Sequence, residues 1–93
     1  MRTVVESIIV LKGMVTGASP PLGGVLTPIL SSLLDFAARY AADPTKRGEA
    51  CGKMREFTDR IAIEMAKPKP GMTAAQAVSL TAYANRIKLN LGC

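Results

Sequence analysis

Residues 43–92 decide the fold, and they read DPTKRGEACGKMREFTDRIAIEMAKPKPGMTAAQAVSLTAYANRIKLNLG. Asp43 followed by Pro44 is typical of a helix start, because an aspartate side chain caps free N–H groups and proline is favoured in the first helical position. We expect a helix from there to about Ala66. Its apolar residues recur every three or four positions, which predicts one buried face. That face consists of Ala50, Met54, Phe57, Ile61 and Met65.

The proline-marked segment 67–71, KPKPG, ends this helix and makes a short connection. Thr73 and Gln76 then have the spacing of a capping box, in which each side chain binds the other residue's backbone N–H. Gly92 lies where a helix-terminating glycine is favoured. A last helix is therefore predicted between Thr73 and Gly92. Its buried face is predicted to contain Ala77, Leu80, Ala84, Ile87 and Leu91.

The N-terminal part predicts a helix within residues 2–15, because its apolar residues again follow helical spacing. Thr27 followed by Pro28 resembles a second helix start, and that helix is predicted to end near residue 42. Ser19 before Pro20 offers an alternative, earlier start, which would leave Pro28 as a kink.

These four segments predict an all-α fold, a small bundle of three to four helices with short Pro/Gly turns. Residues 1–93 are expected to form a single helical domain, because a chain of this length has no room for a second core. Alanine is abundant and only four residues are aromatic, so the core buries little area per residue. Oligomerisation is one ordinary way for so small a bundle to gain stability.

Residues 13–34 carry no charge, which raises the question of a membrane segment. Four glycines and three prolines interrupt this stretch and would leave backbone groups that lipid cannot satisfy. The sequence therefore predicts a turn followed by a buried helix, and it disfavours a membrane role. Glu6 and Lys12 interrupt the first apolar run, which argues against a signal peptide. We expect an intracellular, cytoplasmic location or one within a virion.

The residue inventory argues against catalysis. The chain has no histidine, and no two of its acids are spaced to face each other on the apolar side of a helix. The glycines of residues 16–24 lack the lysine of a phosphate-binding loop. We therefore predict that the protein is not an enzyme, and that it uses no cofactor, no metal and no small-molecule substrate. Cys51 is expected to be a half-buried residue of a helix and Cys93 a free thiol, and the alternative is that Cys93 forms a crosslink to a neighbouring molecule or to Cys51.

The leading functional hypothesis is a structural or adaptor subunit that packs by apolar helix faces into a homo- or hetero-oligomer. A virion component and an accessory subunit of a large complex both fit this description. The predicted partner-binding residues are Val4, Ile8, Leu11, Leu22, Leu26 and Leu30. Leu80, Ile87 and Leu91 are expected to face them from the core.

Two alternatives remain open. The net charge of +5 allows a nucleic-acid-associated protein that contacts phosphates through the helix after Pro44. The residues for this role are Lys46, Arg47, Lys53 and Arg60. We expect no aromatic side chain interleaved with these basic residues, so stacking against nucleobases is not predicted. The second alternative is a small inhibitor that docks on a partner protein, which the fold alone does not distinguish from a subunit.

Overall fold

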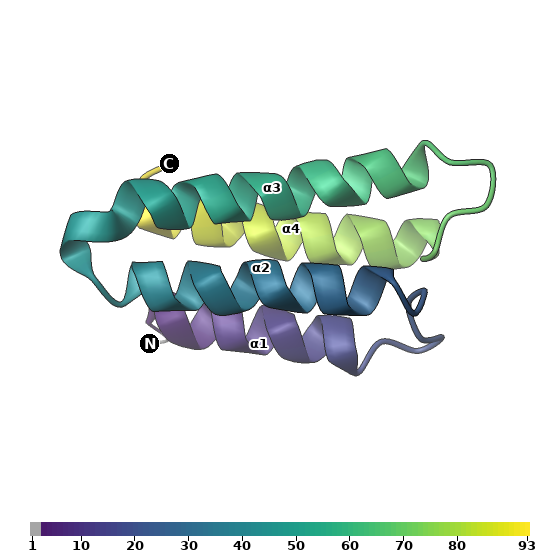
Figure 1. Ribbon diagram of the computed structural model, residues 1–93, viewed down its shortest axis with the longest axis horizontal. Coiled ribbons are helices and arrows are strands. Elements are labelled where there is room, and N and C mark those ends of the chain that lie inside the picture. The colour runs from purple at the N-terminus through teal and green to yellow at the C-terminus, as the bar shows by residue number, and fades with distance from the viewer. Residues whose placement is uncertain (1–2) are drawn as a thin grey trace.

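The computed structural model describes residues 3–93 and has four helices in up-and-down order (Figure 1). Each helix packs against the next one in sequence, and α1 also packs against α4. The bundle measures 39 × 22 × 19 Å. This confirms the predicted all-α bundle. The elements are α1 (Val4–Thr16), α2 (Leu26–Ala41), a short 3-10 turn η1 (Pro44–Lys46), α3 (Arg47–Met65) and α4 (Ala74–Leu91).

Capping side chains fix the helix ends where the sequence contains them. Thr73 accepts a hydrogen bond from the N–H of Gln76, and the Gln76 side chain accepts one from the N–H of Thr73. This confirms the predicted capping box of α4. Gly92 ends the helix at a φ of 81°, a left-handed conformation that glycine adopts without a steric cost. At the other end of the chain, Thr3 caps α1 through the N–H of Glu6.

The predicted helix boundaries in the N-terminal half differ from those of the structure where the structure describes them. The predicted beginning of the first helix, residue 2, lies outside the described residues, and α1 continues through Gly13 to Thr16. The helix α2 begins at Leu26, so Pro28 falls in its first turn, where the backbone nitrogen has no carbonyl within the helix to donate to and the missing N–H of proline costs nothing. The alternative start at Pro20 is wrong, because that residue lies in the loop between α1 and α2.

Asp43 caps the 3-10 turn rather than α3. Its Oδ1 accepts from the N–H of Thr45 at 2.9 Å and from the Thr45 hydroxyl at 2.7 Å. These hydrogen bonds to the charged form hold the pKa of Asp43 below its usual value. The chain therefore makes a tight turn at Asp43, and α3 begins three residues later than Pro44.

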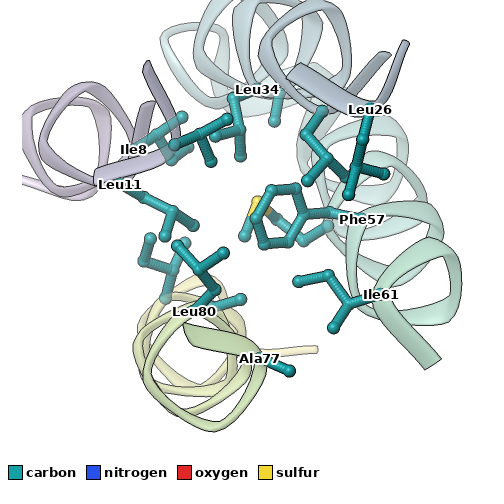
Figure 2. Close-up of a cluster of buried hydrophobic side chains, with 14 of the residues drawn as sticks. Ile8, Leu11, Leu26, Leu34, Phe57, Ile61, Ala77 and Leu80 are labelled. Carbon is teal, nitrogen blue, oxygen red and sulfur yellow. The ribbon is translucent and has the colours of Figure 1, made fainter. Parts of the chain in front are cut away.

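The core runs the length of the bundle and is filled by one stripe from each helix. Phe57 lies at its centre, with labelled side chains from all four helices around it (Figure 2). The predicted faces of α3 and α4 are buried, except that Met65 is half-buried. The loop residues Leu22 and Met72 are buried at the end where the α1–α2 and α3–α4 connections meet.

Glu64, near the end of α3, holds the α3–α4 connection, which a backbone hydrogen bond then joins to the α1–α2 loop. One oxygen of this buried carboxylate accepts from the N–H of Gly71 at 2.7 Å, and the other accepts from Lys67 Nζ at 3.0 Å. Gly71 in turn accepts from the N–H of Gly23 at 2.8 Å, across to the α1–α2 loop. The Gly71 N–H, followed by the Lys67 ammonium, lowers the pKa of Glu64.

This arrangement predicts a loss of stability in acid. Because the Glu64 pKa is lower in the folded than in the unfolded chain, its contribution is complete above the unfolded value of about 4.3 and is lost as the pH falls through the folded value. We expect the urea midpoint of the natural protein to exceed that of Glu64→Gln at neutral pH, and the difference to shrink steadily below pH ~4. Urea titrations at several pH values measure this.

Glu49→Gln is the matched control, since Glu49 is exposed in the first turn of α3. The difference in urea midpoint between Glu49→Gln and the natural protein should not shrink as the pH falls. A Glu64→Gln difference that stays constant down to pH ~3 would mean that the carboxylate charge is not what stabilises the α3–α4 connection.

Candidate protein-docking groove

The structure corrects the predicted partner surface. Five of its six residues are buried in the core of this same chain, namely Ile8, Leu11, Leu22, Leu26 and Leu30. The sixth, Val4, is half-buried against that core. Periodicity identified apolar faces on α1 and α2, but the packing of the four helices against one another covers them. These side chains are therefore not available to a partner, and a charge at Ile8 or Leu30 would act on folding. Leu80, Ile87 and Leu91 are buried, as predicted.

A surface groove follows the seam between α3 and α4. It consists of two adjoining hollows of about 410 and about 420 Å³, and Asn85 lines both. Its two rims follow helical spacings of four and three, so each rim is a straight stripe along its helix. The α3 stripe consists of Cys51, Arg55, Thr58, Ala62 and Met65, and the α4 stripe consists of Val78, Ala82, Asn85 and Leu89.

Small side chains leave the groove open. Ala62 on α3 and Ala82 on α4 are too short to bridge the seam above the core residues Ile61 and Ala77. The larger apolar residues of the α4 stripe are left in solvent: Val78 is 70% exposed and Leu89 is 75% exposed. An apolar surface of this kind, bounded by two helices, is a common docking site for a third helix.

The two ends of the groove differ in charge. Arg55 and Lys88 line the hollow beside Cys93, whereas the hollow at Val78 has no charged lining residue. Among the described residues that line either hollow, none is acidic. Lys88 Nζ donates a hydrogen bond to Thr58 Oγ1 at 3.2 Å, which holds this ammonium group over the seam. The ion pairs of residues 3–93 do not include Arg55.

A disulfide between Cys51 and Cys93 closes the basic end of the groove, with 5.7 Å between the two Cα atoms. Cys51 is half-buried as predicted, but the expectation of free thiols is wrong and the crosslink alternative is right. One signal could have identified the pair. In an antiparallel hairpin of α3 and α4 that turns at residues 66–73, the beginning of α3 lies beside the end of α4. Cysteine spacing alone gives no such information.

The four predicted phosphate-binding residues are placed on different surfaces. Lys46 and Lys53 lie over the rings of Tyr40 and Phe36, with 5.8 and 5.6 Å from nitrogen to ring centre. Lys53 also pairs with Glu56 at 3.5 Å. Arg47 is exposed at the start of α3. Arg60 lines another hollow, between α2 and α3, in which Glu56 and Asp59 are its acidic neighbours.

The expectation that no aromatic side chain lies among these basic residues is wrong. The rings of Phe36 and Tyr40 are stacked with 6.3 Å between their centres, and Arg39 also lies over Phe36 at 5.5 Å. The sequence did not reveal this cluster because its aromatic rings come from α2 and two of its cations from η1 and α3. Only the antiparallel packing of α2 against α3 brings them together.

Two other kinds of feature, a metal cluster and a membrane-spanning helix, are absent from the described part of the chain. Within residues 3–93, no three side chains of the metal-binding types come close enough to hold an ion. Of the four helices, none has both the length and the apolar character that crossing a membrane requires. No protein-family model, curated protein or solved structure matches the sequence or the fold.

Proposed function

We propose that this protein is a non-enzymatic structural or adaptor subunit that receives a helix of a protein partner in the α3/α4 groove. The observation that supports this proposal best is the groove itself, an open apolar seam whose exposed residues Val78 and Leu89 follow helical spacing. An amphipathic helix places apolar side chains at the same spacing, so its ridge fits between the two stripes. An accessory subunit and a virion component remain the assemblies that we propose.

The energetics favour a protein ligand. Full burial of a valine or leucine side chain contributes about 1.5–3 kcal/mol, and both side chains are mostly exposed in the isolated chain. The seam is shallow and long, and α3 alone contributes residues over about 21 Å, from Cys51 to Met65. A small molecule would stay largely exposed there, whereas a helix would cover both stripes. An inhibitor that docks through this groove would use the same contacts.

The disulfide bears on where such an assembly forms. Disulfides persist on virions and in other oxidising settings, and they are rare in the reducing cytoplasm. Of the two locations predicted from the sequence, the Cys51–Cys93 bond supports the virion over the cytoplasm. We propose an oxidising setting on this ground.

The test of the proposed function uses a designed helical peptide of about 18 residues, about 27 Å long, with a single leucine stripe and no net charge. We expect NMR titration of the labelled protein to show shifts concentrated at Val78, Ala82 and Met65. Val78→Asp should weaken binding by at least about tenfold, because the helix would cover an unpaired carboxylate. The substitution should leave the fold intact, since Val78 is 70% exposed.

Ile9→Asp is the matched control. Ile9 is 58% exposed on α1, which lines neither hollow, so the same change there should leave peptide binding unaltered. Equal weakening by both variants, or shifts spread over all four helices, would contradict a docking groove between α3 and α4.

A nucleic-acid-associated role is the second candidate, and the stacked rings of Phe36 and Tyr40 favour it. Bases stack on aromatic side chains in proteins that bind single strands, and Arg39, Lys46 and Lys53 would supply phosphate contacts. Affinity for a single-stranded oligonucleotide should then fall steeply between about 50 and 200 mM salt. Weak binding that is indifferent to salt would exclude this candidate.

A further inference from the structure

The groove has a direction, because its uncharged part and its basic part occupy opposite ends. Ala62, Met65 and Val78 lie toward the connection between α3 and α4, while Arg55 and Lys88 lie toward the disulfide. In Figure 1 these two ends are the right and left ends of the α3/α4 pair. A bound helix therefore meets only uncharged side chains along one half of its length, and two cations beside Leu89 along the other.

We propose that the occupant is an amphipathic helix of a different protein, which carries an acidic side chain at the end that lies over Arg55 and Lys88. This inference rests on the proposed docking function of the groove. It adds that the partner carries an acidic side chain, and it specifies which end of the bound helix carries that side chain.

The need for an acidic side chain on the partner follows from the free-energy cost of covering the two cations. A docked helix removes water from Arg55 and Lys88, and a cation left unpaired at an interface weakens binding. A carboxylate offsets this cost, because arginine binds it through two parallel hydrogen bonds. Lys88 is already held over the seam by Thr58, so little side-chain freedom remains to be lost at this position. In the described part of the chain, no acidic side chain lines the groove.

A second copy of this chain fits the groove poorly. If two copies met groove to groove in parallel, Arg55 and Lys88 would face their own counterparts. In the antiparallel arrangement the same cations would lie against the uncharged half, at Val78 and Ala82. The charges of the groove therefore disfavour self-association through this face and favour another protein.

The opposite side of α3 does not supply the missing acid either. Its hollow combines apolar residues with Glu56 and Asp59, which at first sight complements the groove. However, Arg60 lines the same hollow and Lys53 pairs with Glu56, so two cations balance the two acids. A head-to-tail contact between copies would bring no net negative charge to Arg55 and Lys88.

The test compares two peptides that share the leucine stripe of the neutral peptide and differ in a pair of residues at one end, glutamate in one and lysine in the other. The protein is used with its disulfide intact, in its natural form and as Arg55→Glu/Lys88→Glu. We expect the glutamate peptide to bind the natural protein at least about tenfold more tightly than the lysine peptide, and the order to reverse in the variant. This reversal cancels any difference in helicity between the peptides. NMR shifts at Val78 and Ala82 verify that both occupy the groove.

The outcomes separate this inference from the function on which it rests. Equal affinity of both peptides, with shifts in the groove, would overturn the acidic partner and leave the docking function standing. The absence of groove shifts with every peptide would overturn both. Light scattering of the unmixed natural protein gives the third result: a dimer that Val78→Asp dissociates would identify a second copy as the occupant and overturn the inference. A monomer agrees with it.

Discussion

Reduction of the Cys51–Cys93 disulfide is expected to lower the free energy of unfolding by about 4 kcal/mol, because the bond closes a loop between residues 42 apart and restricts the unfolded chain. This is a large fraction of the stability of a small domain, which is typically about 5–15 kcal/mol. Urea denaturation followed by far-UV circular dichroism, with and without a reductant, measures the loss.

The variant Cys51→Ser/Cys93→Ser provides the control for this experiment. It should be as unstable as the reduced natural protein, and the reductant should not affect it further. Both cysteines line the basic end of the groove, where Cys51 is half-buried and Cys93 is exposed. The serine hydroxyls of the variant therefore remain within reach of water. If oxidised and reduced natural protein unfold at the same urea concentration, the crosslink does not contribute as the loop-closure argument requires.

Truncation of the central aromatic residue is the second change with a large effect. Phe57→Ala is expected to destabilise the protein by about 3–5 kcal/mol, through lost burial and the cavity left behind. Phe57 is 0% exposed, and its ring occupies the middle of the cluster drawn in Figure 2. No single side chain from the other helices can fill that space without leaving its own position.

The second phenylalanine of the chain supplies a matched control. Phe36 is 39% exposed on α2, where its ring contacts Tyr40 and lies beneath Arg39 and Lys53. Phe36→Ala removes the same atoms but leaves no closed cavity, so we expect a loss of about 1 kcal/mol. Both variants are measured with the disulfide oxidised, which keeps Phe57→Ala folded enough for a urea titration. Equal losses would mean that Phe57 is not the centre of the core.

Features that depend on neighbouring residues could be predicted from the sequence. The capping box of Thr73 and Gln76 and the terminating Gly92 involve hydrogen bonds within one turn, so their spacing determines them. Thr27 and Pro28 show the limit of such signals. Thr27 before Pro28 is a favourable helix start. However, Leu26 is buried and the Gly23–Gly71 hydrogen bond holds the preceding loop, so α2 begins at Leu26, one residue before Thr27.

Features that depend on which helices are neighbours could not be predicted in this way. Periodicity identified Ile8 and Leu30 as apolar-face residues, but it does not say whether the chain or a partner covers them. The candidate groove arises because Ala62 and Ala82 come to lie on opposite rims of one seam, and in the sequence each is an ordinary alanine. The ring cluster of Phe36 and Tyr40 was missed for the same reason.

The covalent link at the end of α4 also determines how the molecule responds to a pulling force. Handles attached at residues 3 and 93 would transmit tension from α1 through α2 to Cys51 and then directly across to Cys93. The intervening residues 52–92 would bear no load, so α4 and most of α3 would stay unstretched while the first two helices unravel. The fully extended oxidised chain would be about 140 Å shorter than the reduced one, from 42 residues at about 3.4 Å each. Under a pulling force the disulfide therefore divides the protein into two parts. The α1 and α2 helices bear the load, and most of the α3/α4 hairpin is protected from it.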